Sequence, residues 1–421
     1  MLRTLTFLTI FSFVLLQNNW AQNIPITFQS DNLTLNGTLT IPTGQGPFPA
    51  VILVHGSGPS DRDQTVTLSD GNSMCLYPQL FGKTIKNFKD IAEYLGNQGI
   101  AVLRYDKRTF THGASLDEKT ISTYDFANDI EAAIDFLKTR SEVNAECIVL
   151  AGHSQGSVLI PVAAMGRNDV AGLISLAGTV TPIDSILPEQ FRDIYIQCAN
   201  APALGELVAS QFYNQFQQKR QGTFPLDQQV EINVPGNPSN PVPFGYGLFW
   251  RDWIEMNDAV IDNYTSIGVP ILIMQGENDF NVPPDNADKF EAGLPATRTT
   301  VLKYPGINHF LTTQNDPKVD SQLLADMADW IKNTKTSSVK NIATEKAATV
   351  VVKDSSILVN FDTANHGFTR FEMLDVNGKT ISKGPIDRAS AVEININLTP
   401  GQYFLSLTGK KHLTQPFVVV R

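Results

Sequence analysis

This sequence of 421 residues contains only three cysteines and six histidines. Three cysteines are too few for a disulfide scaffold, and they do not have the spacing of metal ligands. Cys147 lies in an apolar run typical of a buried strand. Cys75 and Cys198 could pair in an oxidising compartment, which the sequence alone does not decide. The sequence implies no metal ion and no organic cofactor.

Positive charge and long apolar runs are also in short supply. The net charge is -10 and no basic stripe is present, which argues against a nucleic-acid partner. The start of the chain combines Arg3, an apolar stretch over residues 5–16 and a small residue, Ala21. This pattern predicts a secretory signal peptide over residues 1–21, with an uncleaved membrane anchor as the alternative. Nothing later in the chain is long and apolar enough to cross a bilayer.

Residues 22–333 alternate between strand-like and helix-like patterns. An antiparallel hairpin is expected over residues 24–41, with turns at residues 31–32 and 36–37. Expected strands cover residues 49–54, 100–105, 147–151, 170–177, 269–275 and 298–304, and expected helices cover residues 88–97, 124–139, 285–292 and 318–333. This alternation predicts an α/β domain with a mainly parallel sheet that helices cover on both faces.

An insertion at residues 180–266 interrupts the alternation. It is rich in Gln, Asn, Pro and aromatic residues, and its length is typical of a functional cap or lid. A helical packing unit without substrate contact is the alternative. The aromatic residues are Phe212, Tyr213, Phe216, Phe244, Tyr246, Phe249, Trp250 and Trp253.

The composition changes again near the end of the chain. Residues 334–348 are polar with little apolar periodicity, which predicts a linker. Residues 349–421 contain short β-like runs with turn signals at Asn377-Gly378 and Pro400-Gly401. They predict a small all-β domain that folds as a β-sandwich.

The most informative segment is Gly152-His153-Ser154-Gln155-Gly156, which has the pattern G-x-S-x-G. An apolar β-branched run precedes it and a helix-compatible stretch follows it. This strand–turn–helix setting is that of the nucleophile elbow in α/β-hydrolases, where glycines relieve the clashes around a strained serine. Ser154 is therefore the candidate nucleophile, and a chance Gly/Ser turn is the alternative.

A serine hydroxyl needs a neighbouring base, and histidine has a suitable pKa. In hydrolases of this fold the catalytic order is serine, acid, histidine, and His309 is the histidine that fits this order. The acid is expected at the end of a strand between the two, where Asp279 is our choice and Glu277 the runner-up. Asp285 is expected instead at the start of a helix.

The expected oxyanion hole uses two backbone N–H groups. One belongs to Gln155, the residue after the nucleophile. The other is expected from Ser57, in the turn His55-Gly56-Ser57-Gly58-Pro59 that follows an early strand. A simple glycine turn is the alternative for this segment.

Three blocks of the chain resemble a subgroup of α/β-hydrolase carboxylesterases: residues 51–63 with H-G-S-G-P, residues 99–108 with R-Y-D-K-R, and G-H-S-x-G. The resemblance covers roughly residues 23–332, but the cap matches no motif. It implies a triad of Ser154, Asp279 and His309 and an esterase for short acyl chains. In the second block we expect a structural ion-pair network formed by Arg104, Asp106, Lys107 and Arg108. Contact of these side chains with the substrate is the alternative.

The tail is similar to a type IX secretion C-terminal sorting domain, a small β-sandwich of the Bacteroidetes. The resemblance rests on residues 374–379, residues 398–404 and the basic end Lys410-Lys411-His412. It implies export through the periplasm to the outside or the cell surface, with the type IX machinery as a partner. A carbohydrate-binding module is the alternative, but the tail lacks an exposed aromatic stripe.

The expected function is that of a secreted serine esterase with an acyl-enzyme intermediate and a small-molecule ester substrate. Two alternatives remain: a peptidase or acyl-thioester hydrolase with the same triad, and a non-catalytic surface protein on a hydrolase scaffold.

Overall fold

The computed structural model describes residues 20–237 and 241–336, together with the C-terminal strands at residues 349–352, 356–360, 368–375, 380–385, 391–395, 401–409 and 412–419. The chain divides into two compact units, Met1–Ser338 and Val339–Arg421. Most of the expected signal peptide and linker lies outside the described residues. No helix of the described part is long and apolar enough to cross a membrane.

An eight-stranded sheet forms the centre of the first unit, in the order β1-β2-β6-β3-β7-β8-β11-β12. Only the β1–β2 and β2–β6 pairs are antiparallel, and the remaining pairs are parallel. The strands are β1 (Gln22–Ser30), β2 (Leu33–Ile41), β3 (Phe48–Val54), β6 (Ala101–Tyr105), β7 (Val143–His153), β8 (Val170–Leu176), β11 (Ile271–Gly276) and β12 (Thr299–Tyr304). The expectation of a mainly parallel sheet is confirmed.

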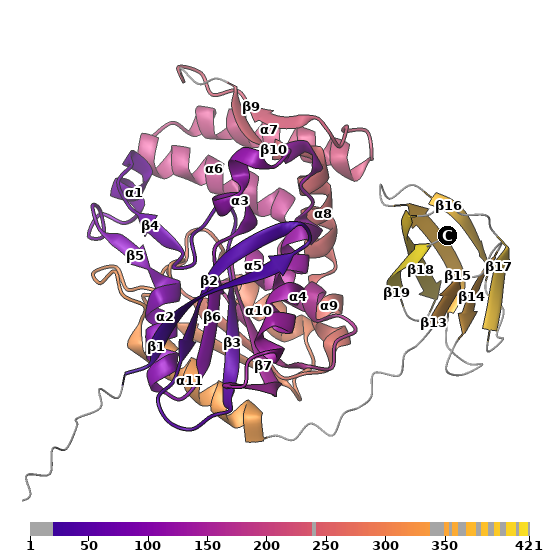
Figure 1. The fold of residues 1–421 in the computed structure, drawn as a ribbon. Helices are drawn as coiled ribbons and strands as arrows, with labels where there is room; N and C mark the ends of the chain where they lie inside the picture. The colour runs from indigo at the N-terminus through magenta and orange to yellow at the C-terminus, as the bar shows by residue number, and fades with distance from the viewer. Residues whose placement is uncertain are drawn as a thin grey trace, which may run out of the picture. The chain divides into compact units, whose positions relative to one another are not determined.

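Helices cover both faces of this sheet (Figure 1). On one face lie α2 (Asn87–Asn97) and α11 (Ser321–Thr336), and on the other lie α4 (Thr123–Lys138), α5 (Gln155–Ala164) and α10 (Asp285–Gly293). The sequence of α4 shows why it forms, because Phe126, Ile130 and Ile134 recur on one buried face. A capping box between Ser122 and Asp125 starts this helix.

The insertion forms a cap whose upper elements lie over one end of the sheet (Figure 1). It contains α6 (Ile183–Ala199), α7 (Pro202–Arg220), β9 (Gln229–Ile232), β10 (Val242–Tyr246), α8 (Gly247–Asp258) and α9 (Val260–Ile267). Phe212 stacks on Phe216, and Trp250 stacks on Trp253, all four being buried. These aromatic side chains belong to the same apolar core as buried residues of α4 and α5.

Shorter elements connect the main ones. Strands β4 (Thr65–Thr67) and β5 (Thr84–Lys86) form a small antiparallel pair around α1 (Gly71–Leu76), and α3 (Arg108–Thr111) follows β6. Two single 3₁₀ turns, η1 (Gly113–Ser115) and η2 (Glu118–Thr120), then lead into α4.

Several expected boundaries differ from the structure. The expected turn at residues 36–37 is wrong, because both residues lie inside β2 and Gly37 pairs with Ile26. A Cβ on Gly37 would lie 2.8 Å from the Ile26 side chain and 2.9 Å from the Arg104 carbonyl oxygen, so this glycine marks a close approach. Helix α11 continues to Thr336, past the expected linker start at residue 334, and the Thr334 hydroxyl bonds the Trp330 carbonyl.

The second unit contains two antiparallel sheets, ordered β13-β14-β17 and β16-β15-β18-β19. Its strands are β13 (Thr349–Val352), β14 (Ser356–Asn360), β15 (Phe368–Asp375), β16 (Thr380–Pro385), β17 (Ala391–Asn395), β18 (Gly401–Gly409) and β19 (His412–Val419). Both sheets supply buried apolar side chains, among them Val359, Met373 and Leu405. The expected turn at residues 377–378 lies outside the described residues.

Candidate active site

Ser154 lies at the junction of β7 and α5, in a backbone conformation that few residues adopt. Its φ is 54° and its ψ is -117°. Such a strained conformation persists only where the surroundings enforce it, and it is frequent at active sites. A Cβ on Gly152 would overlap the Gly156 carbonyl, and one on Gly156 would overlap the Val54 carbonyl. The two glycines therefore permit a turn too tight for any side chain.

The turn after β3 lies directly against this elbow. A Cβ on Gly56 would lie 3.3 Å from the Ser154 Cβ atom. Ser57, the next residue, is exposed, while Gln155 is buried at the first position of α5. A backbone N–H at that position has no acceptor within its own helix. The structure thus places Gly56, the residue before Ser57, and the free start of α5 next to Ser154.

Asp279 and His309 lie next to each other on the loops that follow β11 and β12. Nδ1 of His309 is 2.9 Å from Oδ2 of Asp279. The other carboxylate oxygen, Oδ1, accepts the backbone N–H groups of Asn281 and Val282, each at 2.8 Å. Asp279 is buried, whereas the runner-up acid, Glu277, is exposed. The carboxylate is therefore held in one orientation, facing the imidazole.

His153 connects the elbow to the histidine loop, a role that sequence reasoning missed. Its Nε2 lies 2.7 Å from the His309 carbonyl oxygen, and its Nδ1 lies 2.7 Å from Nε2 of Gln64. Because a carbonyl only accepts, Nε2 carries the proton and Nδ1 accepts from the Gln64 amide. Burial, followed by the nearby His309, lowers the pKa of His153 to about 3. A neutral His153, the residue before Ser154, thus holds the His309 backbone through this hydrogen bond.

The cap and the residue just after α1 both contact the loop that carries Asp279. The Tyr77 hydroxyl donates to Oδ1 of Asn281 at 3.2 Å, and its ring packs against Phe310. From the cap, the Gln190 amide donates to the Asn281 carbonyl. A disulfide joins Cys75 of α1 to Cys198 of α6, with the Cα atoms 5.6 Å apart. The cap is therefore fixed next to the acid loop.

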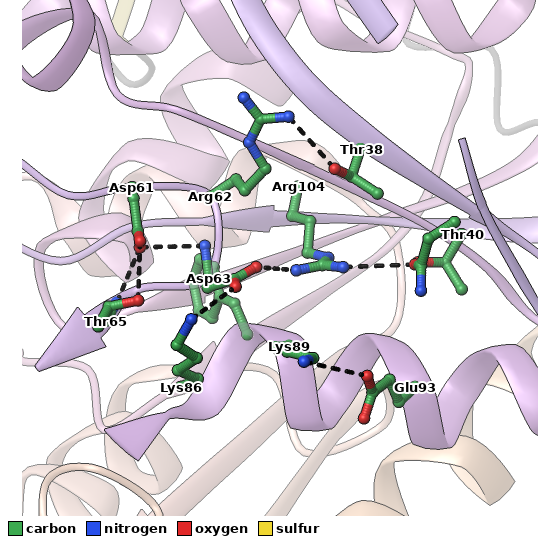
Figure 2. Close-up of polar contacts among 12 residues, drawn as sticks. Thr38, Thr40, Asp61, Arg62, Asp63, Thr65, Lys86, Lys89, Glu93 and Arg104 are labelled. Atoms are coloured by element: carbon green, nitrogen blue, oxygen red, sulfur yellow. Dashed lines mark hydrogen bonds and ion pairs between the residues drawn. The ribbon is translucent and has the colours of Figure 1, made fainter. Parts of the chain in front are cut away.

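Charged residues of the R-Y-D-K-R block form ion pairs with earlier segments of the chain and with α4. Arg104 pairs with Asp63, which also pairs with Lys86, as Figure 2 shows. Asp106 receives a two-pronged contact from Arg62. Arg108 likewise pairs with Asp129 and Asp31, with Nη2 2.7 Å from the Asp129 carboxylate. The expected ion-pair network is present for these residues.

Lys107 departs from that expectation. Its amino group turns inward and donates to the Gly56 carbonyl at 2.7 Å and to Oε1 of Gln155 at 3.1 Å. Nothing in the spacing of the block distinguishes this lysine from its neighbours. Its two partners become apparent only once β3, β6 and α5 are assembled.

The resulting chemistry is that of a nucleophile, a base and an anion-binding turn. A serine in a strained elbow, a histidine held by a carboxylate and free backbone N–H groups are the parts that acyl transfer requires. Among the described residues, no cluster of three or more His, Cys, Asp or Glu side chains could hold a metal ion.

Comparison with known proteins identifies the family of the chain. Residues 81–317 match the family model described as Serine aminopeptidase, S33. The esterase EstD of Thermotoga maritima is 27% identical over 321 residues, which cover 73% of this chain and 68% of that protein. The bifunctional esterase/perhydrolase DCH of Acinetobacter calcoaceticus is 26% identical over 253 residues, covering 54% of this chain and 82% of that protein.

Among solved structures, Est1E from Butyrivibrio proteoclasticus is similar, with 20% identity, a TM-score of 0.44 and coverage of 74% of this chain and 97% of that one. The family match spans more than half of the chain and includes Ser154, Asp279 and His309. The chain therefore belongs to the Serine aminopeptidase, S33 family and is a serine hydrolase of the α/β-hydrolase fold.

Proposed function

We propose that the protein hydrolyses carboxylic esters with short acyl chains through an acyl-enzyme intermediate. Oγ of Ser154 attacks the ester carbonyl carbon while its proton moves to Nε2 of His309. Asp279 holds the Nδ1–H group and stabilises the imidazolium, and the N–H groups of Gln155 and Ser57 bind the oxyanion. His309 then protonates the leaving alcohol. A water molecule repeats these steps and releases the carboxylic acid.

The observation that carries this proposal is the contact of 2.9 Å between His309 and Asp279 beside the elbow. With Nδ1 engaged by the carboxylate, Nε2 of His309 remains for the serine. The His309 ring centroid lies 4.8 Å from that of His153, the residue before Ser154. The names of EstD and DCH, both esterases, support an ester as the substrate.

A series of p-nitrophenyl esters tests the reaction and the acyl length together. We expect hydrolysis of the acetate and butyrate, and a fall in kcat/KM from the octanoate onward. Ser154→Ala should lower kcat by at least roughly 10⁴-fold, because the nucleophile is removed. Ser141→Ala, at an exposed position outside the site, should leave kcat unchanged. Hydrolysis that survives in Ser154→Ala would refute the assignment of the nucleophile.

A peptidase is the second candidate, because the description of the matching family names an aminopeptidase. The same triad cleaves amides when the leaving amine is protonated by the histidine. Aminoacyl p-nitroanilides and acyl thioesters, assayed beside the esters, separate these activities. A higher kcat/KM for the p-nitroanilides than for the acetate ester would replace the esterase proposal with the peptidase.

We also propose that the protein is exported, with residues 1–21 removed and residues 349–421 acting as a type IX sorting domain. The start of β1 at Gln22 and the separate compact C-terminal unit support this proposal. Mass spectrometry of the protein from culture medium should find Gln22 at its N-terminus. Deletion of residues 349–421 should stop its appearance in the medium, and undiminished secretion of the shortened chain would overturn the sorting role.

A further inference from the structure

Lys107 is buried directly beneath the turn and helix that supply the proposed oxyanion hole. Only 4% of the residue is exposed, and its amino group contacts both the turn after β3 and the start of α5. It donates to the carbonyl oxygen of Gly56 at 2.7 Å and to Oε1 of Gln155 at 3.1 Å. One amino group therefore connects the two segments that supply the proposed oxyanion hole.

The contact with Gly56 bears directly on Ser57. The Gly56 carbonyl and the Ser57 N–H belong to one peptide plane, in which they point in opposite directions. A donor that holds the carbonyl therefore also fixes the direction of the N–H. The contact with Gln155 acts in a similar way, because it pins the side chain of the residue whose own N–H completes the hole.

The surroundings of Lys107 differ from those of its charged neighbours. In the described part of the chain, Arg104, Asp106 and Arg108 each have a salt-bridge partner within 4.0 Å, whereas none is found for Lys107. Its amino group instead lies 4.5 Å from the centre of the Phe126 ring. Burial lowers the pKa of Lys107 to about 7, with Asp129 acting in the opposite direction.

Both protonation states of this amine retain at least two N–H donors, enough for both acceptors. Burying an amino group costs free energy that an apolar side chain at this position would avoid. Simple packing therefore does not explain why a lysine occupies this position. The two acceptors, the Gly56 carbonyl oxygen and Oε1 of Gln155, do explain it.

We propose that Lys107 is the positioning residue of the oxyanion hole, holding the Gly56–Ser57 peptide and Gln155 at a fixed separation so that both N–H groups point at the developing oxyanion. This inference rests on the proposed function, in which those two N–H groups stabilise the tetrahedral intermediate. Lys107 itself does not contact the substrate. It acts on the transition state through the two groups that it holds.

The chain contains a matched control for this lysine. Lys219 of α7 is also buried, its amino group donates to the Gly247 carbonyl at 3.3 Å, and it lies 3.8 Å from the Phe224 ring centre. Burial lowers its pKa to about 7 as well. It differs from Lys107 in lying within the cap, so a general effect of removing a buried lysine should appear in both variants.

The test compares Lys107→Met with Lys219→Met in the full-length protein, using p-nitrophenyl acetate. Removing one oxyanion donor costs roughly 10²–10³-fold in kcat, and mispositioning both should cost roughly 10–10²-fold. KM should change by less than about threefold, because the ground state makes little use of the hole. The Ki of a trifluoromethyl ketone, whose adduct carries an oxyanion, should rise by the same factor as kcat falls.

Gln155→Met provides a second variant if Lys107→Met fails to fold, because it keeps the Gln155 N–H and removes one acceptor. We expect a smaller fall in kcat, and the double variant should be no slower than Lys107→Met, since both changes break the same connection. Lys107→Arg, which keeps the donors, should recover part of the lost kcat.

The outcomes are distinguishable. A wild-type protein that hydrolyses no ester contradicts the proposed function. An active wild type together with a folded Lys107→Met that keeps its kcat and its Ki overturns the role of Lys107 alone. Equal losses in Lys107→Met and Lys219→Met, or a loss confined to KM, would also overturn it.

Discussion

Two histidines with different hydrogen-bond partners lie side by side next to Ser154. His309 faces the carboxylate of Asp279, whereas His153 is buried, neutral and bonded to the His309 backbone. A neutral His153 adds no positive charge beside the imidazolium that the proposed reaction forms on His309. Among the described residues, His309 is the one histidine whose Nδ1 contacts a carboxylate. The division of roles follows from hydrogen-bond partners rather than from residue type.

The substitution Asp279→Asn tests whether the Asp279 carboxylate fixes the tautomer of His309. The amide can present an N–H to Nδ1 and so favour the wrong tautomer of His309, and kcat should fall by roughly 10³–10⁴-fold. Glu277→Gln is the matched control, because it makes the same chemical change two residues away on an exposed side chain. Steady-state kinetics with p-nitrophenyl acetate measure both. A larger loss in Glu277→Gln would reverse the assignment.

The residues of the candidate site differ in whether local sequence patterns predict their positions. Chain order and strand ends select Ser154, Asp279 and His309, because local patterns mark the elbow and the carboxyl ends of strands. His153 and Lys107 escape such reasoning. Their partners lie 89 and 156 residues away for His153 and 51 and 48 residues away for Lys107. Only the assembled sheet brings those groups together.

At the scale of elements, the disulfide between α1 and α6 ties the cap to the body of the enzyme. It closes a loop across a sequence separation of 123 residues. Tyr77, just beyond α1, and Gln190 of α6 both bond to Asn281 in the acid loop. Three segments that are distant in the sequence are thereby fixed at one edge of the site.

Cys75→Ser/Cys198→Ser should lower the free energy of unfolding by about 2–5 kcal/mol, because the unfolded chain gains the freedom of the opened loop. Urea unfolding with and without dithiothreitol measures this effect. Reductant should shift the midpoint of the wild type and leave that of the double variant unchanged, since Cys147 is the remaining cysteine. A urea midpoint of the wild type that does not change with reductant would contradict the stabilising role of the disulfide.

Strands and helices of the sheet domain could be predicted because their apolar periodicity is strong. The boundaries of α2, α4 and β8 lie within one residue of the expected ones. Helices of the cap could not be placed in the same way. Their aromatic residues pack mainly on one another, as Phe191, Phe212 and Phe244 do, so the contacts that define the cap are tertiary rather than periodic.

On the scale of the whole molecule, buried neutral histidines make stability depend on pH. Burial, followed by the charge of Lys107, lowers the pKa of His55 to about 3 from 6.5. The unfolded state therefore binds a proton below pH 6.5 that the folded state does not accept until about pH 3. The stability that a neutral His55 contributes is fully present above pH 6.5 and is lost as the pH falls through this window.

His55→Gln isolates this contribution, because the amide can keep a donor near the Asp61 carbonyl. The difference in unfolding free energy between wild type and variant should fall by about 1.4 kcal/mol for each pH unit below 6.5. Urea unfolding at pH 7, 6 and 5 measures the difference. A difference that stays constant over this range would contradict a neutral His55.

The central claim is that Ser154 is a nucleophile activated by His309 and Asp279. The most direct test is reaction of the full-length protein with a fluorophosphonate, followed by peptide mass spectrometry. We predict a single adduct on the peptide that contains Ser154, no adduct in Ser154→Ala, and a labelling rate reduced by at least roughly 10³-fold in His309→Ala. An unlabelled wild type, or an adduct on another serine, would contradict the account.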